Sequence, residues 1–102
     1  MTQVVHVGPL PERATEAATA FYASTLPAVP PRPGQDLVLV FPPAPHDHHA
    51  WRLAVVQDLA RAAAPARVNG VVGTGEEAIA ATLTWLERAP GVTGQLLSVH
   101  DG

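Results

Sequence analysis

The segment His46-Asp47-His48-His49 is the one cluster in the sequence whose residue types could carry chemistry. Imidazole nitrogens and carboxylate oxygens are good ligands for zinc and similar ions, so a structural or catalytic metal site is one interpretation. However, no two of these histidines have the i, i+4 spacing that places ligands on one helix face. No fourth ligand is evident, and His6 or His100 would join only if folding brought them there. We favour a solvated helix cap, and therefore predict no metal ligands.

Other candidate groups have simpler structural interpretations. The adjacent carboxylates of Glu76-Glu77 would point in different directions on a helix, and acidic residues are favourable in a first helical turn. Trp51 and Trp85 could stack on a base or sugar, but we assign them to core or interface packing because each lies on or next to an apolar helical stripe. Ser24 and Ser98 have no neighbouring base, and cysteine is absent. We expect no catalytic or cofactor-binding residue and no cofactor.

Composition predicts a folded, soluble chain. The 102 residues contain no internal repeat, 47% are hydrophobic and 15% are charged, which favours a single domain over residues 1–102. The net charge of -3, with only six Lys and Arg, provides no basic stripe for nucleic acid. No apolar run approaches the roughly 18 residues of a membrane span, and no apolar leader opens the chain. We therefore expect a cytoplasmic protein without nucleic-acid or membrane partners.

Strand and helix alternate along the chain. Short apolar segments predict four strands, at residues 3–7, 37–41, 67–72 and 95–99. Between them, helical periodicity predicts three helices, over residues 12–26, 47–64 and 76–88. Strands that are joined by helical crossovers lie parallel, and sequential strands then become neighbours. The pattern predicts an α/β fold with about four parallel strands and three helices, in two or three layers.

The predicted helices and loops carry more specific expectations. The first helix should end before Pro27, because proline cannot continue a helix. In the second helix, Trp51 belongs to the stripe that faces the sheet, whereas Arg52 should lie nearer the other side. Asp47 should cap this helix by accepting from backbone N–H groups of the first turn. Residues 29–35 are rich in proline and glycine and predict a loop.

Three short motifs carry a family resemblance. Leu59-Ala60, Arg67-Val68-Asn69 and Thr93-Gly94-Gln95 occur in the order and phase of motifs from the C-terminal half of short-chain dehydrogenases/reductases (SDRs). The chain therefore resembles that half, specifically over residues 50–99 and weakly over residues 1–40. The resemblance implies a truncated Rossmann-like fold that lacks the N-terminal cofactor-binding half. It also implies that Asn69 and Thr93 are fold determinants at strand entrances.

The same resemblance implies that the family's chemistry is missing. The sequence contains no Gly-x-x-x-Gly-x-Gly, the loop that lets the backbone approach a pyrophosphate. The positions that match the catalytic tyrosine and lysine fall near Pro45 and His49, and Pro42-Pro43 replaces the expected serine. Hydride transfer needs a cofactor and an acid in one place. The resemblance thus favours a non-catalytic pseudoenzyme.

The function is open to three hypotheses. The first is an interaction or assembly module that forms a homo-oligomer or binds another protein subunit, through residues 3–7 as a sheet edge or through the helix faces that carry Trp51 and Trp85. The second is an NAD(P)-linked oxidoreductase-type or nucleotide-binding protein whose site is completed by a partner subunit. The third is a small metal-dependent enzyme built on residues 46–49. We favour the first.

Overall fold

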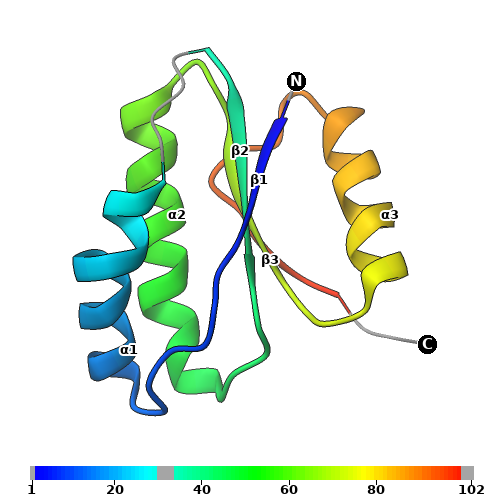
Figure 1. Cartoon of the computed structure of the whole chain (residues 1–102). Helices are drawn as coiled ribbons and strands as arrows, with labels where there is room; N and C mark the ends of the chain where they lie inside the picture. Colours follow the sequence, from blue (N-terminus) through cyan, green and yellow to red (C-terminus); the bar gives the residue numbers. More distant parts are fainter. Residues whose placement is uncertain (1, 30–33, 100–102) are drawn as a thin grey trace.

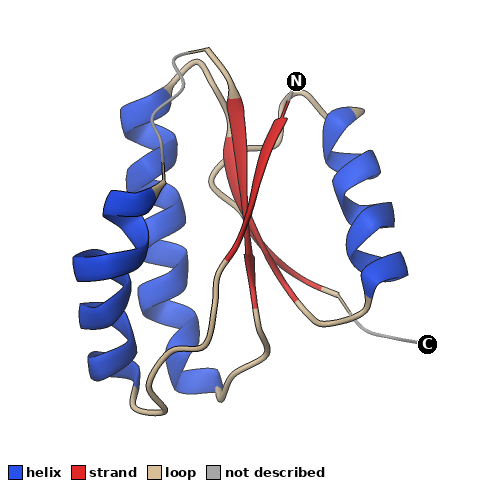
Figure 2. Cartoon of the chain, viewed as in Figure 1, coloured by secondary structure: helices blue, strands red, loops and turns tan. Residues whose placement is uncertain are grey.

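Four parallel strands form one sheet in the computed structural model, which describes residues 2–29 and 34–99 (Figures 1 and 2). The strands are β1 (Thr2–His6), β2 (Asp36–Phe41), β3 (Val68–Val72) and β4 (Leu96–Ser98). The α-helices are α1 (Ala14–Ala20), α2 (His49–Ala63) and α3 (Glu76–Glu87). The strand order is β1-β2-β3-β4, so sequential strands are neighbours. The predicted α/β, Rossmann-like fold is confirmed.

The helices cover the two faces of the sheet unequally. Figure 1 shows α1 and α2 together on one face and α3 alone on the other. Alternate residues of β2 supply both cores: Leu39 and Phe41 pack on the side of α2, while Val38 and Val40 pack on the side of α3. This burial on both faces explains the unbroken apolar sequence of β2. It also leaves the α3 side of the sheet with a single helix to cover four strands.

Two predicted details of the helix ends are wrong. The α1 helix continues through a π-helical turn, Phe21–Thr25, and a 3-10 turn, Leu26–Ala28, which contains Pro27. Proline is tolerated there because the first residues of a helical turn need no N–H donor. A 3-10 turn, His46–His48, precedes α2. No side chain caps either the turn or α2, and Asp47 is exposed, so Asp47 does not act as the predicted cap. Residues 30–33 of the predicted loop lie outside the described residues, as does His100.

Asn69 and Thr93 fix the connection between β3 and β4. The Asn69 side chain donates to the Val92 carbonyl (3.0 Å) and accepts from the Gln95 backbone N–H (3.1 Å). Thr93 Oγ1 accepts from the Val68 backbone N–H at 3.1 Å. These bonds satisfy buried polar groups at the start of the strands. The prediction that both residues are fold determinants is confirmed.

In residues 2–29 and 34–99, no helix combines the length and the apolar character needed to cross a membrane.

Gly70 offers a test of the close packing between β3 and its neighbours. A Cβ atom at this position would lie 2.7 Å from Leu96 Cδ1, 3.0 Å from Val56 Cγ2 and 3.3 Å from Phe41 Cε2. We expect Gly70→Ala to lower the free energy of unfolding by about 1–3 kcal/mol, because the core must shift to admit the methyl group. Chemical denaturation measures the change. Gly91→Ala is the control, since nothing lies within 4 Å of its Cβ position, and equal stability of the two variants would contradict the packing.

Candidate functional site

His48 lies in the core and uses both ring nitrogens within the protein. The residue is 3% exposed. Its Nδ1 accepts from the indole N–H of Trp51 at 3.1 Å, and because indole is only a donor, Nε2 carries the proton. Nε2–H then donates to the Glu12 carbonyl at 2.7 Å. The imidazole thus joins the start of α2 to the segment before α1, and neither nitrogen is free for a metal.

The other members of the histidine cluster do not converge with His48. His46 and His49 are exposed and stack on each other, with ring centroids 5.9 Å apart, and Asp47 is exposed as well. Within the described part of the chain, no three His, Cys, Asp or Glu side chains are arranged to hold a metal ion. The cluster is therefore one structural histidine beside three surface residues.

Arg52 is buried, contrary to its predicted position on the outer side of α2. It is 4% exposed, and its guanidinium lies 4.8 Å from the centroid of the Phe41 ring and 5.6 Å from that of Trp51. One terminal nitrogen, NH1, donates to the Pro42 carbonyl at 2.8 Å, while Nε is buried without a hydrogen-bond partner. Burial lowers the pKa of Arg52. Its long side chain reaches from the first turns of α2 over the end of β2, which a helical-wheel analysis does not foresee.

A cleft opens at the carboxyl ends of β1 and β2, on the α3 side of the sheet. Its volume is about 480 Å³, and its polar lining comes from His6, Thr74 and Glu76. Open α/β sheets usually bind ligands at this edge. Glu76 and Glu77, however, place two carboxylates in the first turn of α3, where a phosphate would otherwise bind. The charge at this helix end opposes the binding of a dinucleotide.

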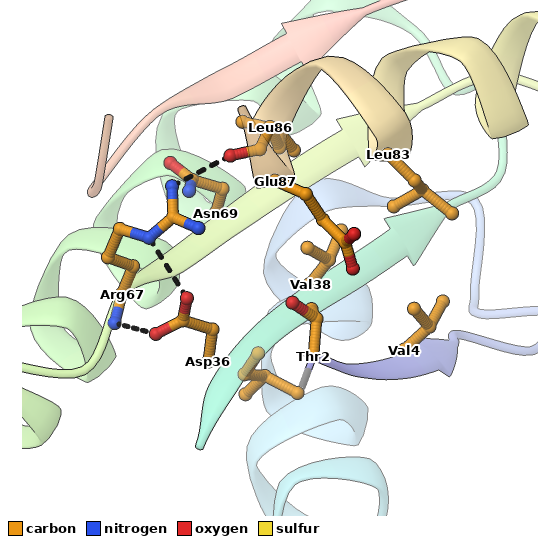
Figure 3. Close-up of a pocket in the computed structure, with 10 residues that line it drawn as sticks. Thr2, Val4, Asp36, Val38, Arg67, Asn69, Leu83, Leu86 and Glu87 are labelled. Atoms are coloured by element: carbon orange, nitrogen blue, oxygen red, sulfur yellow. Dashed lines mark hydrogen bonds and ion pairs between the residues drawn. The ribbon is translucent and has the colours of Figure 1, made fainter. Parts of the chain in front are cut away.

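The opposite end of the sheet holds a small cavity of about 160 Å³ beside an ion pair between Asp36 and Arg67 (Figure 3). Asp36 accepts from the Arg67 backbone N–H at 2.8 Å and from its Nε at 2.9 Å. The NH1 of the same guanidinium donates to the carbonyls of Leu86 (2.8 Å) and Ala89 (2.7 Å), at the C-terminal end of α3. Arg67 therefore ties β2 and β3 to α3. This role of Arg67 was not predicted from the sequence, although Arg67 belongs to the Arg-Val-Asn motif.

The electrostatics of Asp36 follow from these bonds. Burial alone would raise the pKa of Asp36, but the backbone N–H and the guanidinium of Arg67 stabilise the carboxylate and hold that pKa below its usual value. Asp36 and Arg67 make their hydrogen bonds to each other and to the backbone of Leu86 and Ala89. We therefore assign the ion pair a structural role rather than a role in ligand binding.

The outer edge of β1 borders both the cleft at the carboxyl ends of the strands and the small cavity beside the ion pair. Val7 donates its backbone N–H to the Val40 carbonyl at 2.8 Å, and backbone groups alternate in direction along a strand. The backbone groups of Thr2, Val4 and His6 therefore point away from β2. Within the described residues β1 pairs with β2 alone, so these groups have no partner strand.

The cleft and the cavity share Leu83, and we refer to the two together as the groove between β1 and α3. Thr2, Val4 and His6 line it on the strand side, and Val4 is 38% exposed. The helix side is lined by residues of α3, namely Glu76, Ile79, Ala80, Leu83, Leu86 and Glu87. Figure 3 shows Val4 and Leu83 on its two walls and Glu87 reaching from α3 toward Thr2. The groove is apolar in the middle and has a carboxylate at each end.

Asp36→Asn tests the ion pair. At pH 7 we expect the variant to lose about 1.5–3 kcal/mol of stability, because hydrogen bonds to a charged group are lost. A lowered folded pKa stabilises the protein above the unfolded value, near 3.9, and this stabilisation disappears as pH falls through the folded pKa. The difference from wild type, measured by urea denaturation, should thus shrink below about pH 4. Asp58→Asn, in an exposed pair with Arg61, is the control; a difference that stays constant with pH would refute the assignment.

His48→Ala tests the structural role of the buried histidine. We expect a loss of about 1–3 kcal/mol in metal-free buffer, since the variant leaves the Trp51 indole and the Glu12 carbonyl without their partner. His46→Ala and His49→Ala, at exposed positions, should each change stability by less than about 0.5 kcal/mol. Thermal denaturation with and without a chelator measures these effects. Destabilisation of the wild-type protein by the chelator would instead identify a metal site.

Comparisons with known proteins identify the family. The family described as SDR-like, short chain dehydrogenase-like protein, matches residues 5–99. No curated protein matches the chain, and no solved structure does. The match begins within β1, at Val5, and ends at the residue after β4, so it includes β2, β3, β4 and the three α-helices. The parallel Rossmann-like sheet agrees with this assignment. The chain belongs to the SDR-like family of short chain dehydrogenase-like proteins.

Proposed function

We propose that this SDR-like domain is a non-catalytic assembly module that self-associates through the β1 edge. The observation that carries the proposal is the outward direction of the backbone groups of Thr2, Val4 and His6, which have no partner strand among the described residues. Unpaired backbone groups at a sheet edge form a template for another strand. Pairing with a second strand would satisfy them.

The side chains of β1 support the same proposal. Natural edge strands are usually protected by lysine, proline, bulges or short length. The β1 sequence, Thr-Gln-Val-Val-His, contains no proline, no lysine and no acidic residue, and its five residues align in regular register with β2. By contrast, the opposite edge strand, β4, has only three residues. Of these two edges, β1 is the better suited to pairing.

The absence of catalysis is supported by the residues at the carboxyl edge of the sheet. The family resemblance implies that the positions of the catalytic tyrosine and lysine fall near Pro45 and His49. Proline has no proton to donate, and the exposed imidazole of His49 stacks on His46. The buried cation nearby, Arg52, donates to the Pro42 carbonyl at the end of β2. These contacts favour a structural use of this region.

A second candidate function is nucleotide binding with a site completed by a partner subunit. The cleft of about 480 Å³ at the carboxyl ends of β1 and β2 favours it, because this is where open α/β sheets hold ligands. The carboxylates of Glu76 and Glu77 oppose it. NAD(H) or NADP(H) that raises the melting temperature would favour this second function, since a ligand that binds the folded state stabilises it.

Val4→Pro tests self-association. The Val4 N–H points away from β2, so proline removes one outward donor without breaking the β1–β2 ladder. We expect sedimentation equilibrium at tens of micromolar to give a dimer or higher oligomer for the wild type and a monomer for Val4→Pro. Circular dichroism checks that the variant is folded.

Trp85→Ala is the matched control on the alternative surface. Trp85 is 53% exposed on α3, and its truncation should leave the association unchanged. A wild-type protein that sediments only as a monomer would refute the proposed function. Dissociation caused by Trp85→Ala but not by Val4→Pro would indicate that the interface lies on α3 instead of on β1.

A further inference from the structure

We propose that two copies of the chain pair antiparallel through β1, in a register centred on Val4, and that His6 of each copy contacts Glu87 of the other. This inference rests on the proposed function and specifies its geometry. The partner is a second copy of the same chain, related by a two-fold axis perpendicular to the sheet.

The register follows from the directions of the backbone groups. In an antiparallel ladder, two opposite residues whose backbone groups face each other exchange two hydrogen bonds. Centring the pair on Val4 places Val4 opposite Val4 of the partner copy, and Thr2 opposite His6. All three outward-facing residues of each copy then find partners, giving six hydrogen bonds. A register centred on Val5 would pair Val4 with His6 and leave Thr2 opposite Gly8, outside the strand.

The side chains of His6 and Glu87 come within reach of each other in this register. Glu87 lies beside Thr2 at the amino end of β1 (Figure 3), and His6 lies at the carboxyl end. Antiparallel pairing sets His6 of one copy next to Thr2 of the other and hence beneath that copy's Glu87. The imidazole can donate a hydrogen bond to the carboxylate, and the two-fold axis makes the contact twice. A strand from a different protein would need backbone groups in the same outward positions and a hydrogen-bond donor opposite Thr2, within reach of Glu87.

Cysteine cross-linking tests the register directly, because the chain contains no cysteine of its own. Hydrogen-bonded antiparallel partners have Cα atoms about 5.5 Å apart, which is within the range of a disulfide. We expect Val4→Cys to form a covalent dimer under mild oxidation with diamide. Gln3→Cys is the matched control: the two Gln3 positions would lie roughly 8 Å apart and should not cross-link.

Charge exchange tests the His6–Glu87 contact. Glu87→Lys should weaken the dimer roughly tenfold, because two equivalent contacts are lost and a cation meets the imidazole. His6→Glu should weaken it similarly, and the double variant His6→Glu/Glu87→Lys should restore near-wild-type dissociation. Glu77→Lys, which makes the same charge change on α3 but lies outside the groove lining, should have no effect. Sedimentation equilibrium measures all four.

The outcomes separate this inference from the proposed function. Cross-linking of Val4→Cys alone, together with restoration in the double variant, supports the geometry. If the wild type is a dimer but Gln3→Cys cross-links as well as Val4→Cys, the proposed register is wrong although self-association stands. The same conclusion follows if Glu87→Lys and His6→Glu leave the dissociation constant unchanged. A monomeric wild type overturns both. Pairing with a different protein, seen as monomers that associate only with that protein, also overturns the two-fold geometry.

Discussion

Backbone hydrogen bonding at the edges of a parallel sheet is the constraint on which the properties of this domain depend. Helical crossovers connect the strands in the order β1-β2-β3-β4, so within residues 2–29 and 34–99 the strand β1 has β2 as its single neighbour. The last strand, β4, has three residues, whereas β1 has five and pairs with β2 along its full length. Among the described residues, the outward backbone groups of Thr2, Val4 and His6 have no partner strand, and the proposed assembly would satisfy them.

The elements around this edge are held in place by polar contacts rather than by packing alone. Arg67 joins the start of β2 to the C-terminal end of α3, and Asn69 and Thr93 fix the β3–β4 connection. The Arg67 contacts hold the C-terminal end of α3, and α3 packs on the inner strands while the side chains of Val4 and His6 stay exposed. The groove beside β1 is thus a consequence of one helix covering four strands. The carboxylates at its two ends belong to Glu76 and Glu87 of α3.

Much of the fold was predictable because it depends on periodicity. Four apolar segments alternating with three helical patterns determine a parallel sheet whatever the identity of the individual side chains. The positions of Arg52, His48 and Arg67 were not predictable in this way, since each depends on contacts between residues distant in sequence or on the reach of a long side chain. The histidine cluster shows the difference: its composition suggested metal binding, but the tertiary contacts of His48 with Trp51 and Glu12 use both ring nitrogens.

Membership of the SDR-like family and the parallel sheet give this domain the Rossmann-like scaffold on which the proposed assembly rests. Backbone amide exchange tests this account most directly, because it reports the hydrogen bonds of β1 one residue at a time. We expect the amides of Val4 and His6 to be protected in concentrated protein and to exchange quickly after dilution, while Val7, bonded to Val40, stays protected at both concentrations. Rapid exchange of Val4 and His6 in concentrated protein would contradict the account.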